Sequence, residues 1–280
     1  MKALLPALHS AVIIMTPLLF AATGGLFPAL AGMLNIALEG LLLIGAFAAV
    51  AAVYYTGSFA AGIIAAMCIS VLLSALLAFT TMNLRSNVFI TGLAVNLLAA
   101  GLTVVLSYYL FNTRGVFVLH DIKNLNQNVY IYASWLLLLV SWVIIYHTPF
   151  GYRLRACDKH PDALVSLGIY PDIYRWAAFL VSGFFCGIGG SFLSLNLGAF
   201  VPNMTAGKGW IALVVIFLGG RRPLGLIAAA FVFGLAESFS NYAQGLFNIP
   251  ADFILSMPYL LTLLAMVLVS VWVKRQNRAS

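Results

Sequence analysis

Stretches of 18 or more nearly uncharged residues recur from one end of this sequence to the other. Each is long enough to cross about 30 Å of hydrocarbon as an α-helix, which takes roughly 20 apolar residues. The alternation of apolar and polar residues that is typical of a membrane β-barrel is absent, so the spans are predicted to be helices. The pattern indicates an all-α, polytopic transmembrane bundle that occupies residues 1–280 as one domain.

Composition argues against a soluble fold. Of the 280 residues, 63% are hydrophobic and 8% are charged, whereas a soluble domain carries about 25% charged residues. The three cysteines have no paired or metal-ligand spacing, and we interpret them as packing residues. The four histidines have no metal or triad spacing and acidic pairs are lacking, so no metal site is predicted and a membrane-embedded enzyme is disfavoured.

Hydropathy predicts nine spans, two of them irregular. They lie near residues 8–28, 34–54, 59–80, 88–111, 130–148, 174–199, 208–220, 224–243 and 252–273. The first is expected to be interrupted by Gly24, Gly25 and Pro28, and it is interpreted as a span and not as a removable signal. The seventh is short enough to be a half-helix. The expected total is therefore eight to ten membrane segments, some broken.

The charges predict the orientation. The net charge of +7 comes from cations in short loops and at the C-terminus, which is typical of topology signals and not of nucleic-acid binding. With residues 149–173 inside, ten cations share that side: Arg85, Arg153, Arg155, Lys159, Arg175, Arg221, Arg222, Lys274, Arg275 and Arg278. The other side collects Lys2, Arg114, Lys123 and Lys208. This bias predicts a cytoplasmic C-terminus and an N-terminus outside.

The only two glutamates, Glu39 and Glu237, lie inside apolar stretches. An ionisable group there costs about 2.5 kcal/mol or more, so each invites a functional hypothesis. Asn35 precedes Glu39 by four positions, which would place both on one helical face. For both glutamates, lining a substrate pathway and forming hydrogen bonds that fix helix packing remain alternatives.

A second polar set lies in the run from Asn87 to Asn96. Thr91 and Asn96 place polar groups at helical spacing in an apolar segment, where they could pack helices or line a cavity. Phe89, Phe200 and Trp210 are aromatic residues that could stack on a ring of a substrate.

The internal segment 149–173 is the most informative polar stretch. Pro161 is placed to open a short helix within residues 153–169 and Gly168 to close it. Its apolar face would carry Ala163, Leu164, Leu167 and Ile169. Such a helix suits a docking surface for a soluble partner, and a solvated loop that carries topology charges is the alternative. No G-x-x-x-x-G-K-[ST] loop occurs in the chain, so uphill transport would need a partner or an ion gradient.

Several blocks together resemble the branched-chain amino acid and ribose-type ABC permeases, and most of all their nucleoside branch. The resemblance covers most of residues 17–240 in order. The blocks are Asn35-Ile36 with Glu39-Gly40 and Gly45-Ala46-Phe47, then Phe150-Gly151, Leu154-Arg155-Ala156, Gly168-Ile169, Ser182-Gly183, Met204 to Leu213, Gly219, Pro223 and Phe233-Gly234.

The resemblance implies a non-catalytic permease subunit in the bacterial cytoplasmic membrane, forming half of a pathway for a nucleoside. Its implied partners are a second related permease, an ABC ATPase with two nucleotide-binding domains, an extracytoplasmic substrate-binding lipoprotein and membrane lipid. ATP and magnesium would be bound by the ATPase and no cofactor by this chain.

The candidate pathway residues are Asn35, Glu39, Phe89, Thr91, Asn96 and Glu237. By resemblance, the ATPase would be contacted by Arg153, Arg155, Asp158, Lys159, His160, Pro161, Asp162, Ser166 and Gly168. Riboflavin and simple sugars remain alternative substrates within the class. A secondary transporter and a membrane-embedded enzyme are the alternatives outside it.

Overall fold

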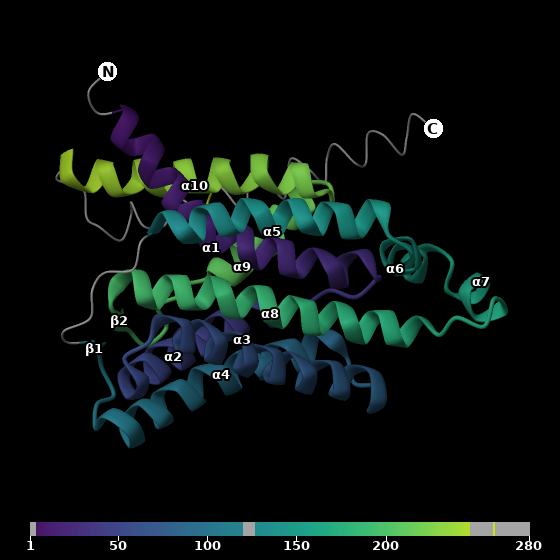
Figure 1. Ribbon diagram of the computed structural model, residues 1–280, viewed down its shortest axis with the longest axis horizontal. Helices are drawn as coiled ribbons and strands as arrows, with labels where there is room; N and C mark the ends of the chain where they lie inside the picture. Colours follow the sequence, from purple (N-terminus) through teal and green to yellow (C-terminus); the bar gives the residue numbers. More distant parts are fainter. Residues whose placement is uncertain (1–3, 120–126, 247–259, 261–280) are drawn as a thin grey trace.

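The computed structural model describes residues 4–119, 127–246 and 260 of the chain (Figure 1). Within these residues the regular secondary structure is helical apart from two short strands. The elements in chain order are α1 (Leu4–Leu30), α2 (Leu38–Thr56), α3 (Phe59–Ala78), the π-helix η1 (Phe79–Asn83), α4 (Val88–Phe111), β1 (Phe117–Val118), α5 (Gln127–His147), α6 (Pro149–Lys159), α7 (Pro161–Ser166), α8 (Pro171–Leu197), β2 (Ala199–Phe200), α9 (Lys208–Leu218) and α10 (Pro223–Leu246).

Seven helices of the described part are long and apolar enough to cross a membrane, which confirms a polytopic helical bundle. They are α1, α2, α3 with η1, α4, α5, α8 and α10. Helix α9 has 11 residues and is therefore only about 16 Å long at 1.5 Å per residue, which confirms the predicted half-helix. The predicted span near 252–273 lies outside the described residues.

Helix α8 runs through the middle of the bundle and packs against α1, α2 and α3 (Figure 1). Glycines permit this close approach. A Cβ at Gly183 would lie 2.7 Å from the carbonyl oxygen of Ser70, and one at Gly187 would lie 2.6 Å from that of Ala66. The backbone of α8 therefore touches the backbone of α3, and both helices keep small residues there.

Two predicted details of the first spans are wrong. Helix α1 is continuous through Gly24, Gly25 and Pro28. Gly24 does not interrupt the helix but permits close packing against α8, since a Cβ at Gly24 would lie 2.7 Å from the Cβ of Phe185. Helix α2 begins at Leu38 and not near residue 34. Asn35 therefore precedes the helix and does not share a helical face with Glu39.

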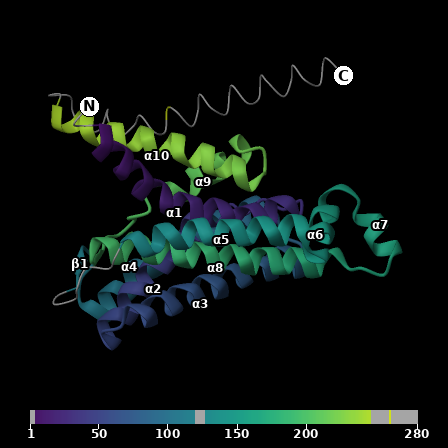
Figure 2. The same ribbon diagram turned by 45° about the horizontal axis from the view of Figure 1, so that its top comes forward.

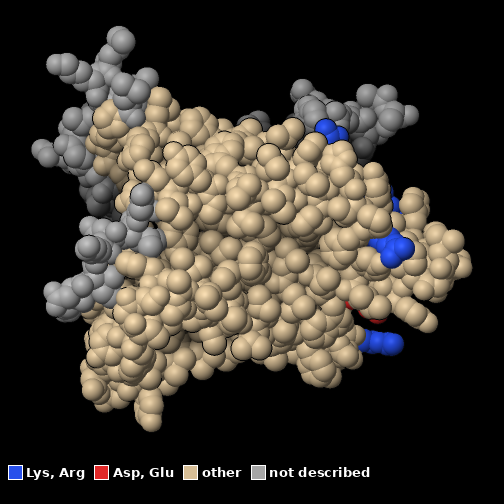
Figure 3. All heavy atoms as spheres, viewed as in Figure 1, with Lys and Arg blue, Asp and Glu red and all other residues tan. Residues whose placement is uncertain are grey.

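The two ends of the bundle differ. At one end, β1 pairs antiparallel with β2, with Phe117 opposite Phe200. At the other end, α6 and α7 project beyond the long helices in both ribbon views (Figures 1 and 2). The visible lysines and arginines gather at the end that carries α6 and α7, while the long lateral face in this view shows no charged side chains (Figure 3). That end is called the basic end below.

Candidate functional site

Two short non-helical segments enter the interior of the bundle and meet there. Residues 31–37 connect α1 to α2, and residues 201–207 connect β2 to α9. Gly209, in the first turn of α9, packs so closely on α2 that a Cβ would overlap the backbone of Glu39. The first turns of α2 and α9 are therefore in contact.

This meeting point lies well away from the basic end along the length of the bundle. Asn35 contacts Ser182, which is 11 residues from the start of α8 at the basic end, a depth of about 16 Å. Glu237 contacts Lys208 and lies 14 residues from the start of α10 at the same end, a depth of about 21 Å. Both depths fall within a hydrocarbon layer of about 30 Å.

The carboxylate of Glu39 caps the N-terminus of α9. Its Oε1 accepts a hydrogen bond from the backbone N–H of Gly207 at 2.8 Å, and its Oε2 accepts one from Gly209 at 2.6 Å. Charge-assisted hydrogen bonds of this length are the stronger kind, and the positive end of the α9 dipole adds to them. The cost of an anion in this apolar setting is thereby offset.

Lys208 and Glu237 form an ion pair beside this cap. The Lys208 Nζ and Glu237 Oε1 atoms are 2.6 Å apart, and the two side chains are 15% and 24% exposed. The structure thus corrects the placement of Lys208 in an outer loop, because the chain re-enters the bundle through residues 201–207 before α9 begins. Intramembrane charges are expected to be paired in this way.

Asn35 and Asn96 stabilise the non-helical entry to α2. Asn35 donates from Nδ2 to the Ser182 hydroxyl at 2.8 Å and accepts from the backbone N–H of Ala37 at 3.0 Å. Asn96, on α4, accepts from the N–H of Gly40 at 2.7 Å and donates to the carbonyl of Ile36 at 2.9 Å. The two amides satisfy backbone groups that the helix break leaves free.

Four of the six predicted pathway residues, namely Asn35, Glu39, Asn96 and Glu237, thus surround the two chain breaks. Phe89 and Thr91 lie apart from them, in the first turn of α4. Phe89 is 59% exposed on the side of the described bundle, and Thr91 bonds the Asn87 carbonyl.

The other two aromatic candidates differ in exposure. Phe200 is fully buried and packs edge-on against Phe47, so its ring faces the core. Trp210 is 42% exposed on α9.

The projecting segment consists of two helices where one short helix was predicted. Pro149 starts α6 behind the capping hydroxyl of Thr148, and Pro161 starts α7. Gly168 ends α7 with φ +73°, while its N–H donates to the Val165 carbonyl at 2.9 Å. The predicted roles of Pro161 and Gly168 as helix boundaries are confirmed, although the extra helix α6 was missed.

Salt bridges and hydrogen bonds hold α6 on the bundle. Asp158 pairs with Arg221 of the α9–α10 turn at 3.4 Å, and Arg153 donates to the Tyr174 hydroxyl at 2.9 Å. The guanidinium of Arg155 lies 4.8 Å from the centre of the Tyr146 ring. A displacement of α6 would therefore also displace residues of α8, α5 and the turn that follows α9.

Most of the segment 159–170, which contains α7, instead faces solvent. Lys159, His160, Asp162 and Ser166 are exposed. The predicted apolar face does not pack as a unit, because Leu164 is buried while Leu167 is 75% exposed. A six-residue helix is too short to turn every apolar side chain inward.

The partners of both glutamates were not predicted from the sequence. The available signal was the segment Gly207-Lys208-Gly209, since a cation flanked by glycines starts a helix too short to cross the membrane. Glycine lets the backbone approach a carboxylate closely. That signal suggests a charged contact but does not say which glutamate makes it.

Comparison with known proteins gives one family. The family model described as "Branched-chain amino acid transport system / permease component" matches residues 8–275. The nucleoside ABC transporter permease protein NupC of Lactococcus lactis is 30% identical, over 90% of this chain and 88% of its own length. The guanosine ABC transporter permease protein NupQ of Bacillus subtilis is 33% identical, over 89% and 87%.

Two further similarities are more distant. A putative glucose ABC transporter permease protein of Haloferax volcanii is 28% identical over 85% of this chain and 78% of its own. Among solved structures, a chain of PsaBC from Streptococcus pneumoniae in complex with Fab aligns with a TM-score of 0.52 and 16% identity. It covers 92% of this chain and 90% of the other, and it supports the fold alone.

Proposed function

The chain belongs to the family of branched-chain amino acid transport system permease components, and we propose that it forms half of the translocation pathway of an ATP-driven importer for a nucleoside. As a permease subunit it is a multi-pass membrane protein without catalytic chemistry of its own. The family implies an ABC ATPase and a substrate-binding protein as partners.

The observation that carries this proposal is the meeting of the two broken segments at Glu39. Transporters bind their substrates near the middle of the membrane, where discontinuous helices offer free backbone groups and helix ends. Here the starts of α2 and α9 bring two helix ends together beside Lys208 and Glu237. Helix packing alone does not require two re-entrant segments with three ionisable side chains.

The pairing of these charges favours an uncharged substrate. Glu39 is satisfied by two backbone N–H groups, and Lys208 is satisfied by Glu237. An ionic substrate would need a counter-charge released from one of these pairs, at a cost of several kcal/mol. A hydroxyl-rich, neutral nucleoside leaves both of these pairings intact. The names of the two relatives that are at least 30% identical point to the same class.

We place α6 and α7 against the ATPase. Helix α7 exposes Leu167, and the neighbouring Val165 and Tyr170 are 56% and 69% exposed, outside the long apolar helices. Apolar side chains in that position suit burial against a soluble protein. The contacts of Asp158, Arg153 and Arg155 would then carry a movement of α7 into the bundle.

The finer composition of the importer is part of the proposal. A second, related permease would complete the pathway, and an ATPase with two nucleotide-binding domains would bind ATP and magnesium. A lipoprotein would deliver substrate on the opposite side. The basic end would face the cytoplasm, in agreement with the positive-inside rule, with the C-terminus cytoplasmic and the N-terminus outside.

A simple sugar is the second candidate substrate, because a relative named as a putative glucose permease is 28% identical. A sugar and a nucleoside both present ribose-like hydroxyls. Only the nucleoside adds a flat aromatic ring that a side chain such as Trp210 could stack on. Comparing the uptake of a nucleoside with that of a sugar distinguishes the two candidates.

Transport by the reconstituted importer tests the function. The chain is inserted into vesicles with its partner permease, ATPase and binding protein, and uptake of radiolabelled guanosine is compared with that of glucose and riboflavin. We expect ATP-dependent guanosine uptake that stops when the ATPase is inactivated. Uptake of glucose or riboflavin but not of guanosine would contradict a nucleoside as the substrate. Uptake that does not need the ATPase would indicate a secondary transporter.

A further inference from the structure

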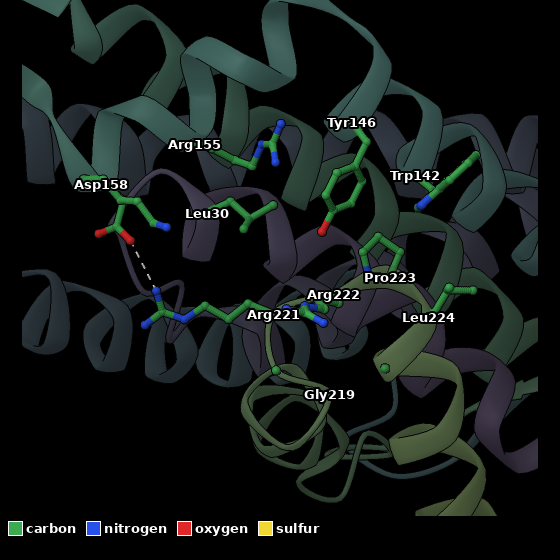
Figure 4. A pocket seen from close by; sticks show the side chains of 13 residues that line it. Leu30, Trp142, Tyr146, Arg155, Asp158, Gly219, Arg221, Arg222, Pro223 and Leu224 are labelled. Atoms are coloured by element: carbon green, nitrogen blue, oxygen red, sulfur yellow. Dashed lines mark hydrogen bonds and ion pairs between the residues drawn. The ribbon is translucent and has the colours of Figure 1, made fainter. Parts of the chain in front are cut away.

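A cavity of about 900 Å³ opens at the basic end of the bundle, away from the meeting point of α2 and α9 (Figure 4). It lies between the end of α5, helix α6 and the α9–α10 turn. The hydroxyl of Tyr146 points from α5 toward the turn that carries Arg221 and Arg222 (Figure 4). A cavity of this size can hold a molecule of several hundred daltons.

The walls of the cavity are strongly cationic. Arg155, Lys159, Arg221 and Arg222 line it together with a single carboxylate, Asp158. Arg221 pairs with that carboxylate, whereas Arg222 and Lys159 make no ion pair among the described residues. The cavity therefore carries a surplus of positive charge that an anion would neutralise.

One side of the cavity is apolar and lies at the depth of a membrane interface. Trp142 and Tyr146 occupy the last turns of α5, which has 21 residues and so spans about 31 Å. Tryptophan and tyrosine concentrate where a span leaves the hydrocarbon. Leu30 continues this wall, and Leu224, 70% exposed, lies at the rim.

We propose that this cavity binds the headgroup of an anionic phospholipid. Its phosphate lies between Arg222 and Lys159, and the first part of its acyl chains lies along Trp142 and Leu224. Basic pockets between transmembrane helices on the cytoplasmic side suit such headgroups. The N-terminus of α10 at Pro223 borders the same space and adds the positive end of a helix dipole.

The apolar wall selects a lipid over a soluble anion. A free phosphate would use the guanidinium groups but would leave the surfaces of Trp142 and Leu224 in contact with water. A phospholipid covers both kinds of surface at once. The site lies apart from the residues around Glu39, although it shares α6 with the surface that we place against the ATPase. Lipid binding and transport are measured separately, so the inference can fail while the proposed transport function stands, and the reverse also holds.

The test measures lipid binding to the assembled importer. The full chain, purified with its partner subunits, is placed in nanodiscs of phosphatidylcholine with or without phosphatidylglycerol, and retained lipid is counted by native mass spectrometry. Arg222→Glu is compared with Arg85→Glu, which makes the same charge change at the same end but outside the cavity. Arg222→Lys keeps the charge.

The parent protein is expected to retain phosphatidylglycerol selectively. Arg222→Glu is expected to weaken that binding roughly 30-fold, since each cation near an anionic lipid contributes about 1 kcal/mol and the reversal changes two unit charges. Arg85→Glu and Arg222→Lys are expected to bind like the parent.

Three results would overturn the proposal. Equal losses in Arg222→Glu and Arg85→Glu would mean general surface attraction. Inorganic phosphate that displaces phosphatidylglycerol at equal concentration would mean a soluble-anion site. Binding to the permease alone that disappears when the ATPase is added would assign the cavity to the protein interface.

Discussion

The backbone N–H of Gly209 donates a 2.6 Å hydrogen bond to the carboxylate of Glu39, joining residues 170 positions apart in the chain. The contact ties the first turn of α2 to the first turn of α9. The carboxylate of Glu39 thus holds the start of the half-helix α9 in position inside the bundle. Five predictions follow from this arrangement and from the two ends of the bundle.

Two substitutions of Glu39 distinguish the contribution of its charge from that of its hydrogen bonds. Glu39→Gln keeps one acceptor oxygen, so one of the two N–H groups loses its partner, at about 1–3 kcal/mol. Glu39→Leu leaves both without an acceptor and is expected to be clearly worse. Thermal unfolding in detergent should rank parent, Gln and Leu in that order, with most transport retained by Gln. A Gln variant that assembles normally but does not transport would assign the charge a mechanistic role.

The Lys208–Glu237 pair is expected to behave as a coupled unit. Either Lys208→Met or Glu237→Gln leaves one charge unpaired, at a cost near the lower end of the 3–5 kcal/mol range because the side chains are 15% and 24% exposed. The double variant removes both charges and should be more stable than the worse single variant. A double-mutant cycle from thermal unfolding measures this, and additive effects would contradict the pairing.

Gly209 is expected to tolerate no side chain. In Gly209→Ala the new Cβ overlaps the Glu39 backbone, so α9 must shift and both carboxylate hydrogen bonds weaken. Gly101→Ala is the matched control, because no atom lies within 4 Å of its Cβ position in the described structure. The amount of monodisperse protein after extraction should fall sharply for the first variant and stay near the parental amount for the second.

Cysteine labelling tests the orientation. A cysteine at Ser166, on α7, should react only from the cytoplasm, and one at Val116, near β1, only from outside. Cys68→Ser removes the exposed native thiol. Burial raises the pKa of the Cys157 thiol, which leaves little reactive thiolate at neutral pH, so Cys157 should stay silent. Labelling at position 166 from outside intact cells would reverse the topology.

Disturbing the end of α7 is expected to prevent the permease from stimulating ATP hydrolysis by its partner. Gly168 has φ +73° and its N–H bonds the Val165 carbonyl, so Gly168→Pro loses both the angle and the donor. Combined with Arg155→Glu, it should lower substrate-stimulated ATPase activity steeply while the permease still inserts. Gly168→Ala keeps the N–H and should act mildly. Parental activity of the double variant would remove α7 from the coupling pathway.

The hydropathy and length of the apolar segments predicted most of the helices. A segment that crosses hydrocarbon must bond its own backbone groups within the helix and present apolar side chains to the lipid. The ends of α4, α5 and α8 lie within three residues of their predicted positions. The continuous α1 was not predicted, because glycine and proline in a sequence do not reveal whether a neighbouring helix packs on them. In the projecting segment, Pro161 and Gly168 predicted α7, whereas α6 was not predicted.

The sequence by itself determined that the chain spans the membrane many times, that α9 is too short to cross it, and that four polar residues within apolar stretches needed partners. Only the tertiary structure decided which partners they have. Glu39 meets Gly207 and Gly209, and Lys208 turns inward to Glu237. The reason is physical: hydropathy is a local property of the chain, whereas an ion or a free N–H inside a membrane is satisfied by any complementary group that the packing brings near it.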